Sequence, residues 1–293
     1  MDNQLEKKQW TIVGLGELLW DLFPDRKELG GAPANFAYHA KMLGAKSFIV
    51  SAIGDDLLGR DLLQSLSRMG MDSSYIQRNH QNTGTVAIDF DLNGEPLYEI
   101  SFPNAWDFIQ SKPILDLAKT CDAVCVGTLA QRSAVSRQCI QAFLDACPET
   151  ALRIFDLNLR SDTMDRELLE ETLRKTKLLK MNETEKYRLE TFFSADLRDL
   201  MQVFYIDYCA ISRAEKGSYL LTKEAIFEGA AVQCDFCSPV GAGDAFTAAL
   251  CMKLLEKSDF EEALHFANRY ASLICSKPGA MPEMKNHDLE SLQ

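Results

Sequence analysis

One segment of the sequence places a carboxylate next to a glycine-rich turn. Gly241, Ala242 and Gly243 precede an apolar run with helical spacing, and Asp244 falls in the first turn of that expected helix. Small residues allow a ligand to approach the main chain, and the free N–H groups of a helix N-terminus favour a bound anion. A carboxylate beside an anion suits phosphoryl transfer, because it can accept the proton of an attacking hydroxyl. Alternatively, Asp244 only caps the helix and the turn is an ordinary loop.

A second segment has the composition of a helix entry with room for a ligand. Gly30 and Gly31 precede Pro33, and proline is common in the first turn of a helix. The glycines leave space against the main chain, and the Asn35 amide can both donate and accept hydrogen bonds. The segment predicts either part of a binding site for a polar ligand or a helix entry that binds nothing.

The hydrophobic pattern predicts a scaffold in which strands and helices alternate. Strands are expected at 11–15, 47–53, 123–126, 152–157 and 208–211. Helices are expected at 33–43, 57–69, 134–146, 165–178, 241–255 and 261–274. Such alternation is typical of a doubly wound α/β fold, with a mostly parallel sheet flanked by helices on both faces. No repeat or linker divides the chain, so residues 1–293 are expected to form a single domain.

Three strand-like runs break this alternation. Residues 85–91 and 97–102 flank an Asn-Gly pair at 93–94, a strong hairpin signal, and residues 18–23 follow directly on the first strand. They are expected to form a small antiparallel sheet that acts as a lid and shields a reaction from water. The lid would comprise about 17–30 and 84–104. Alternatively, these strands extend an edge of the main sheet, and the pattern does not separate the two arrangements.

Length, composition and charge narrow the class of protein. The 293 residues, 46% hydrophobic and 25% charged, are enough to bury a substantial core. With 31 basic and 43 acidic residues the net charge is −12, which disfavours a general nucleic-acid-binding protein. No apolar run approaches the roughly 18 residues of a membrane span, and the polar N-terminus is unlike a signal peptide. Nine cysteines, an odd number, predict reduced thiols in a cytoplasmic protein.

Several familiar catalytic motifs are absent from the sequence. There is no G-x-x-x-x-G-K-[ST], which argues against a P-loop, and no G-x-S-x-G. Gly14 and Gly16 begin a dinucleotide-like pattern, but Leu19 stands at the third glycine position, so a Rossmann NAD site is not expected. None of the four histidines has metal-ligand spacing with another. The pair Cys234 and Cys237 lacks the second pair that a zinc site requires.

Together, these segments resemble the two signatures of the ribokinase-like (PfkB) carbohydrate kinase family, in the right order and over nearly the whole chain. The segments that carry the resemblance are 16–21, 30–35, 43–45, 53–59, 156–160, 180–185 and 240–244. The first two, Gly-Glu-Leu-Leu-Trp-Asp and Gly-Gly-Ala-Pro-Ala-Asn, most resemble bacterial fructokinases. The resemblance implies a ribokinase-like fold and an ATP-dependent sugar kinase, with D-fructose converted to fructose 6-phosphate.

The resemblance also implies roles for individual residues. Asp244 would be the catalytic base for the sugar's primary hydroxyl, and the N–H groups of residues 241–243 would hold the transferred phosphoryl group. The residues that would bind the sugar are Asp21, Gly30, Gly31, Asn35, Asn158 and Arg160. Those on the nucleotide side would be Asn182, Ser212, Gly217 and Asn268, the last being alternatively an ordinary helix residue. Mg²⁺, which keeps much of its hydration, would be positioned through water by Asn182 and Glu185.

Two segments depart from the family's pattern. Ser238 and Pro239 stand where the family usually has Asp-Thr, so activation by a monovalent cation such as potassium is doubtful here. Proline also lacks an N–H donor and stiffens the approach to the expected anion site. The family's T-x-G phosphate segment appears as Ser212, Arg213 and Ala214, with alanine in place of glycine. Arg213 is either a phosphate contact or a solvated surface residue.

The resemblance leaves the substrate and the assembly open. The same fold serves kinases for ribose, 2-keto-3-deoxygluconate or a nucleoside, because fold does not fix substrate. A non-catalytic sugar-binding relative is a third hypothesis, which the departures favour and the retained Asp244 and Glu185 oppose. Further walls of the sugar pocket are expected from Phe102, Asn104, Trp106, Gln131 and Arg132, although Phe102 and Trp106 are alternatively core beneath the lid. The expected partners are a small sugar and ATP, without nucleic acid or membrane, and an exposed lid allows a homodimer.

Overall fold

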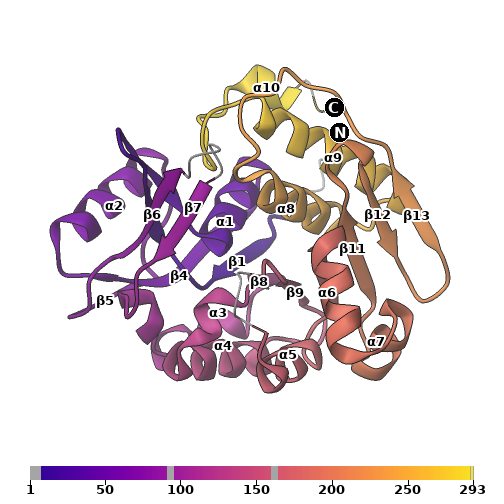
Figure 1. The fold of residues 1–293 in the computed structure, drawn as a ribbon, viewed down its shortest axis with the longest axis horizontal. Helices are drawn as coiled ribbons and strands as arrows, with labels where there is room; N and C mark the ends of the chain where they lie inside the picture. Colours follow the sequence, from indigo (N-terminus) through magenta and orange to yellow (C-terminus); the bar gives the residue numbers. More distant parts are fainter. Residues whose placement is uncertain (1–7, 91–95, 160–163, 291, 293) are drawn as a thin grey trace, which may run out of the picture.

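The structure is a computed structural model that describes residues 8–90, 96–159, 164–290 and 292. Within these residues the main sheet has nine strands: β1 (Thr11–Leu15), β4 (Lys46–Gly54), β5 (Ile76–Asn79), β8 (Ala123–Val126), β9 (Leu152–Asp156), β10 (Leu178–Asn182), β11 (Tyr208–Ser212), β12 (Ser218–Leu221) and β13 (Ile226–Gly229). Their order is β13-β12-β11-β10-β9-β8-β1-β4-β5. Antiparallel pairing is confined to one edge, where β12 pairs antiparallel with both β11 and β13, and the other neighbours are parallel. The expected mostly parallel sheet is therefore confirmed (Figure 1).

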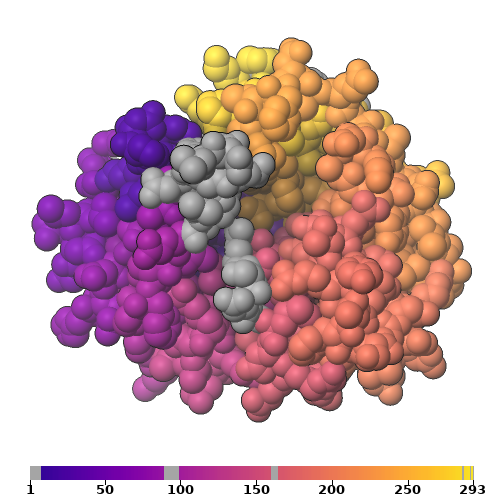
Figure 2. Space-filling model, in the orientation of Figure 1, coloured from indigo at the N-terminus to yellow at the C-terminus, as the bar shows by residue number. Residues whose placement is uncertain are grey.

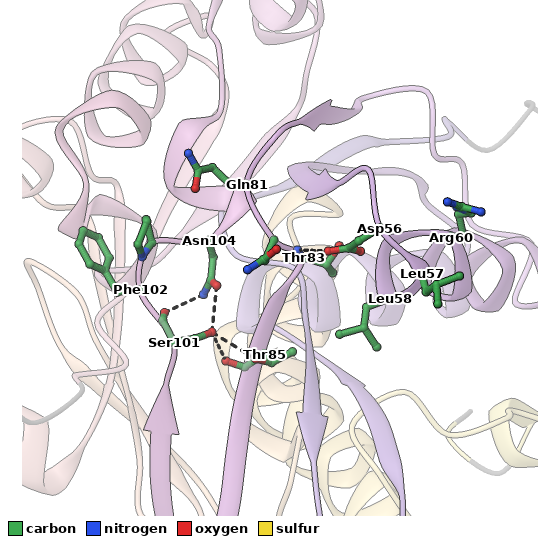
Figure 3. A pocket seen from close by; sticks show the side chains of 12 residues that line it. Asp56, Leu57, Leu58, Arg60, Gln81, Thr83, Thr85, Ser101, Phe102 and Asn104 are labelled. Atoms are coloured by element: carbon green, nitrogen blue, oxygen red, sulfur yellow. Dashed lines mark hydrogen bonds between the residues drawn. The ribbon is translucent and has the colours of Figure 1, made fainter.

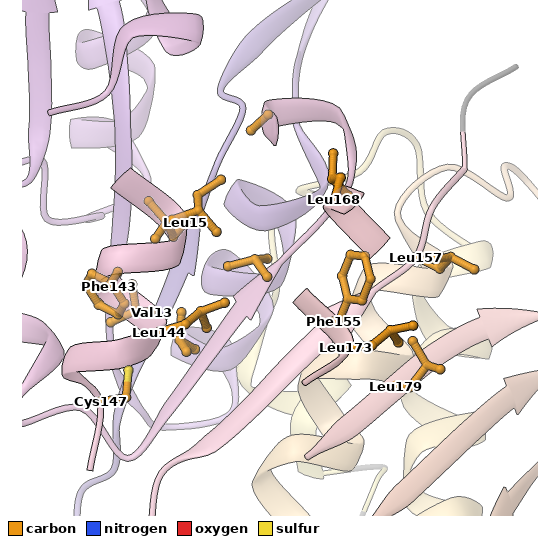
Figure 4. Close-up of a cluster of buried hydrophobic side chains, with 14 of the residues drawn as sticks. Val13, Leu15, Phe143, Leu144, Cys147, Phe155, Leu157, Leu168, Leu173 and Leu179 are labelled. Atoms are coloured by element: carbon orange, nitrogen blue, oxygen red, sulfur yellow. The ribbon is translucent and has the colours of Figure 1, made fainter. Parts of the chain in front are cut away.

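Helices cover both faces of this sheet. They are α1 (Ala32–Met42), α2 (Leu57–Arg68), α3 (Leu115–Ala118), α4 (Ala134–Ala146), α5 (Arg166–Leu173), α6 (Glu183–Phe193), α7 (Leu197–Phe204), α8 (Ala242–Leu255), α9 (Phe260–Cys275) and α10 (Asn286–Glu290). On one face α4 and α5 pack on β1 and β9 through buried residues such as Phe143, Leu168, Val13 and Phe155 (Figure 4). On the other face lie α1, α8 and α9 (Figure 1). No described helix has both the length and the apolar composition needed to cross a membrane.

A second, smaller sheet stands apart from the main one. Its strands are β2 (Leu19–Leu22), β3 (Lys27–Gly30), β6 (Gly84–Phe90) and β7 (Pro96–Ile100), in the order β3-β2-β6-β7. The outer pairs are antiparallel, as expected, whereas β2 and β6 run parallel because the chain between them passes through the main sheet. These strands are therefore not an edge extension of the main sheet. The Asn-Gly pair expected at the β6–β7 turn lies outside the described residues.

The structure corrects the sequence prediction between residues 165 and 182. The helix expected at 165–178 ends at Leu173, and Leu178 begins β10. Leu178, Leu179 and Met181 are completely buried where β10 pairs with β9 and β11, so tertiary packing overrides the local pattern. The pattern also does not predict α6, α7, β5, β12 or β13. The strands β5 and β13 lie at the two edges of the main sheet and β12 lies next to β13, where the apolar signal of a short strand is weak.

Candidate active site

The two glycine-containing segments meet at the N-terminus of α8. Asp244 lies in the first turn of α8, and the Nδ2 atom of Asn35 in α1 donates a hydrogen bond to Asp244 Oδ2 at 2.8 Å. The two residues are 209 positions apart in the chain. The surface is hollowed over α8 on the face shown in Figure 2. The double-glycine segment and the Gly-Ala-Gly turn therefore lie side by side in one site.

The turn at residues 241–243 presents main-chain N–H groups at the head of α8. Gly241 has φ +79°, and a Cβ atom there would lie 2.7 Å from Ala280 Cα, so the position requires glycine. The first N–H groups of a helix have no acceptor within the helix. They lie at the positive end of the helix dipole, which attracts negative charge. The turn therefore has the properties of an anion-binding site.

Ser238 and Pro239 shape the entry to this turn. Ser238 Oγ accepts a hydrogen bond from the Val240 N–H at 3.2 Å, and Pro239 O accepts one from the Ala242 N–H at 3.3 Å. The Ser238 N–H donates to Cys275 O at 3.0 Å, which ties the segment to the end of α9. The departure from the family's Asp-Thr pair thus builds a defined turn. The Ala242 N–H is therefore engaged within the turn, through a long hydrogen bond to Pro239 O.

A buried ion pair lies beneath the turn. Lys180 Nζ, on β10, is 3.1 Å from Asp156 Oδ2 on β9, and the two residues are 8% and 3% exposed. A Cβ atom on Gly243 would lie 3.0 Å from Lys180 Nζ. The Thr247 hydroxyl is 2.8 Å from Gly243 O and 3.3 Å from Asp156 Oδ2, so it links the pair to α8. No role for Lys180 or Asp156 is predicted from the sequence. The signal that could have identified Lys180 is its place within the apolar run 178–181, because lysine is rarely a core residue.

The surroundings of Asp244 bring its titration close to neutral pH. Burial is the main cause that raises the pKa of Asp244 to about 7, and the Asp156 carboxylate contributes. Lys180 and the hydrogen bond from Asn35 act in the opposite direction. The side chain keeps some solvent access at the surface, but protein groups surround it closely. A carboxyl group of this kind can take up a proton during a reaction and release it afterwards.

Four of the residues expected to bind a sugar lie around the start of α1. Asn35 is 5% exposed, and its Oδ1 atom has no hydrogen-bond partner within the described residues. Gly31 has φ +111°, and a Cβ atom there would lie 2.3 Å from Glu17 O. A Cβ atom on Gly30 would lie 2.3 Å from Asp21 Oδ2. The two glycines therefore let the main chain pass close to Asp21 and Glu17. Asp21, Gly30 and Gly31 thus lie together just before the helix that carries Asn35.

Asn158 and Arg160 follow the carboxyl end of β9. Asn158 has φ +34°, and its carbonyl oxygen lies 3.5 Å from the Thr128 hydroxyl. The next residue, Leu159, donates its N–H to Glu185 Oε1 at 2.8 Å, which connects this loop to α6. Arg160 lies outside the described residues, so its role as a sugar ligand stays a prediction.

The further residues expected to form walls of the sugar pocket differ in how deeply they are buried. Trp106 is completely buried and Gln131 is 2% exposed, so both belong to the interior. Arg132 makes hydrogen bonds of 2.9 and 2.8 Å to the buried Asp107 and lies over the Trp106 ring. Phe102 is 67% exposed, which excludes the alternative that it is core. Of this set, Phe102 and Asn104 line the cavity beside the small sheet.

That cavity, of about 770 Å³, opens between the small sheet and the start of α2 (Figure 3). Its polar lining comes from Asp56, Arg60, Gln81, Asn82, Thr83, Thr85, Ser101 and Asn104. Asp56 accepts hydrogen bonds from the Thr83 N–H and hydroxyl at 2.8 and 2.7 Å, which joins the two walls. None of the residues around Asp244 lines it, so the cavity is separate from the place where the two glycine segments meet.

Asn182 and Glu185 form a capping box at the start of α6. Asn182 Oδ1 accepts from the Glu185 N–H, and Glu185 Oε2 accepts from the Asn182 N–H, both at 2.8 Å. Burial raises the pKa of Glu185, and the Asp156 charge adds to this effect. Among the described residues, no three His, Cys, Asp or Glu side chains are grouped to hold a metal directly. Oxygen donors suit Mg²⁺, but the three side-chain oxygens of this pair already accept main-chain hydrogen bonds, so its role in positioning Mg²⁺ through water stays a prediction.

Three expected nucleotide residues lie on the opposite side of α8. Ser212 Oγ is 3.5 Å from Met181 O at the end of β11. Gly217 has φ +81°, and a Cβ atom there would lie 2.1 Å from Gly229 O. Asn268 Nδ2 donates to Ala230 O at 3.1 Å. Gly217 and Asn268 therefore support the chain that leaves β13, on the way to the anion-binding turn.

Arg213 lies against the antiparallel edge of the main sheet. Its guanidinium lies over the Tyr219 ring, 5.2 Å from the centroid, and 3.6 Å from Glu228 Oε1. Both partners belong to the antiparallel edge strands β12 and β13. Arg213 is thus held against the edge of the sheet with its side chain only 20% exposed, and a contact to phosphate stays a prediction.

The chain is similar to known carbohydrate kinases in sequence and in fold. Residues 21–286 match the model of the pfkB family carbohydrate kinases. The fructokinase of Escherichia coli is 25% identical over 98% of this chain and 99% of its own length. The structure of a fructokinase from Xylella fastidiosa with bound ATP has a TM-score of 0.86, with 21% identity over 96% of this chain and 97% of that one. The structure of an uncharacterized sugar kinase from Pyrococcus horikoshii in complex with ATP has a TM-score of 0.82, with 25% identity over 96% of this chain and 100% of that one.

The family match spans most of the chain and includes both segments that meet at Asp244. The expected family and its ribokinase-like fold are therefore confirmed. The chain belongs to the pfkB family of carbohydrate kinases and is a phosphotransferase with an alcohol group as acceptor.

Proposed function

We propose that this kinase transfers the γ-phosphoryl group of ATP to the primary hydroxyl of a small sugar, most closely D-fructose, to give fructose 6-phosphate. The observation that carries the proposal is the 2.8 Å hydrogen bond between Asn35 and Asp244. A sugar hydroxyl beside Asn35 would be close both to a base and to the anion-binding turn. The choice of fructose is supported by the fructokinases among its relatives.

In this mechanism each group at the head of α8 has a defined task. Asp244 accepts the proton of the attacking hydroxyl, which makes the oxygen a better nucleophile. The N–H groups of residues 241–243 offset negative charge on the transferred phosphoryl group. The sugar is oriented by Asp21, Gly30, Gly31, Asn35, Asn158 and Arg160. The small sheet acts as a lid that excludes water, a competing nucleophile.

ATP and Mg²⁺ are the cofactors of this proposal. Asn182 and Glu185 would hold Mg²⁺ through water, and Ser212, Gly217 and Asn268 would support the nucleotide side. When bound, Mg²⁺ neutralises charge on the phosphates. We do not propose activation by potassium, because Ser238 Oγ and Pro239 O already accept hydrogen bonds within the entry turn.

The rate of phosphoryl transfer is expected to fall below about pH 7. Asp244 accepts a proton only when it is ionised, and its pKa is about 7. kcat/KM for the sugar, measured at saturating MgATP from pH 5.5 to 9, should level off above pH 8 and drop about tenfold per unit well below pH 7. A rate that stays constant down to pH 5.5 would exclude Asp244 as the base.

A coupled ADP-release assay over a panel of sugars tests the substrate. We expect kcat/KM for D-fructose to exceed that for ribose, 2-keto-3-deoxygluconate and a nucleoside by at least about tenfold. A higher value for one of these rivals would reassign the substrate while keeping the reaction. Calorimetric binding of sugar and ATP with no ADP release from any of them would instead favour a non-catalytic relative.

We further propose a homodimer and a cytoplasmic location. Residues 17–30 and 84–104 form the lid of a single domain, and two copies pair through it. The exposed Phe102 beside the lid cavity supports such a contact, because an exposed aromatic residue is typical of interfaces. All nine cysteines are free thiols in the structure, which supports a cytoplasmic location.

A further inference from the structure

Several charges act on Asp244 from different elements. The titratable or charged groups that face it are Glu17, Asp156, Lys180 and, as a neutral thiol, Cys125. Of these, only Lys180 carries a positive charge. Its ammonium group is almost inaccessible to water and lies 3.1 Å from Asp156. A buried charge costs free energy unless it is paired, so a lysine kept at this depth needs an explanation beyond packing.

The position of the ion pair supplies that explanation. A Cβ atom on Gly243 would lie 3.0 Å from Lys180 Nζ, so the ammonium group lies directly below the residue that precedes Asp244. Thr247 contacts both Gly243 O and Asp156, which fixes the pair to the first turn of α8 from the other side. The pair therefore contacts the helix turn that carries both the base and the anion-binding amides.

We propose that Lys180 is a positioning residue for Asp244: with Asp156 it forms a buried ion pair that supports the first turn of α8 and keeps a fixed positive charge beside the base. This inference rests on the role proposed for Asp244 as the base. Asp156 lowers the tendency of Asp244 to ionise, and Lys180 raises it. Neutralising one partner or the other should therefore move the titration of Asp244 in opposite directions, a result that a purely structural role of the pair does not predict.

The test compares pH profiles of Lys180→Met, Lys180→Arg and Asp156→Asn in the full-length enzyme. In kcat/KM profiles for the sugar at saturating MgATP, Lys180→Met should move the acid limb to higher pH by about one unit, and Asp156→Asn should move it to lower pH by a similar amount. Lys180→Arg keeps the charge and should return the limb to within a few tenths of a unit of wild type. The titration of ATP is common to all variants and cancels in the differences.

Two further measurements keep the outcome unambiguous. Melting temperatures show whether each variant is folded, and the double variant Lys180→Met with Asp156→Asn, which has no buried charge, should melt above either single neutral variant. Shifts in the same direction, or no shift in folded variants, would overturn the inference. Asp244→Asn separates this result from the proposed function: if that variant stays active the base itself is wrong, whereas if it is inactive and the limb does not move, only the role of Lys180 fails.

Discussion

Asp244→Asn is expected to lower kcat by about 10²–10⁴-fold, the range typical for loss of a general base. Asparagine keeps the size of the side chain, and its oxygen can still accept the hydrogen bond from Asn35, but it cannot take the hydroxyl proton. The effect should fall mainly on kcat, because the interaction with the proton develops only in the transition state. Steady-state ADP release with the preferred sugar measures it.

Thermal unfolding serves as the control for this variant. Because the folded-state pKa of Asp244 lies above its unfolded value, ionisation of this carboxyl group opposes folding as the pH rises from about 4 through about 7. The asparagine variant cannot ionise, so it should melt higher than wild type at pH 8, and the difference should shrink as the pH falls and vanish below about pH 4. Turnover within threefold of wild type in a folded variant would contradict the catalytic role.

The parts of the fold that the sequence predicts best are those with local signals. The double glycine and Pro33 mark the start of α1, and Gly44 marks its end, so the expected and observed bounds differ by one residue at each end. The Gly-Ala-Gly turn marks the start of α8 in the same way. In both segments the glycine at the start of the helix is also a point of close approach: a Cβ atom would meet Glu17 O at Gly31 and Ala280 Cα at Gly241.

Features that depend on distant partners could not be predicted from local pattern. Leu178 and Leu179 continue an apparent helix, and only pairing with neighbouring strands makes them β10. Lys180 belongs to a matched segment, but its proximity to Gly243 arises because β10 ends beneath α8. The resemblance places Asn35 and Asp244 in one site, whereas the hydrogen bond between them depends on how α1 packs against α8.

The sugar pocket shows the same limit at the level of single side chains. Trp106 and Phe102 are both aromatic residues near the expected lid, and the sequence leaves each as wall or core. The structure buries the first completely and exposes most of the second. Burial of an individual side chain depends on the sheet that covers it, here β6, where Gly84 leaves space for the Trp106 indole. The contact between Gly84 and Trp106 cannot be predicted from the local sequence around either residue.

Gly31→Ala is expected to have the second largest effect, a loss of about 10²-fold in kcat/KM for the sugar together with destabilisation by about 2–4 kcal/mol. The backbone at Gly31 has φ +111°, a conformation that residues with a side chain rarely adopt, and the added Cβ atom would lie 2.3 Å from Glu17 O. The main chain must therefore move. The Asn35 N–H donates to Gly31 O at 2.9 Å, so this movement displaces the side chain that contacts Asp244.

Gly44→Ala is the matched control, because Gly44 lies at the opposite end of the same helix. It also has a positive φ, +95°, but a Cβ atom there would meet no atom within 4 Å. This variant therefore carries the cost of the backbone conformation, about 1–2 kcal/mol, without the clash. Urea unfolding and sugar kinetics on both variants separate the two causes. If Gly31→Ala and Gly44→Ala lose the same stability and both keep normal kcat/KM, the close approach of the double-glycine segment to Glu17 does not position Asn35 for the reaction.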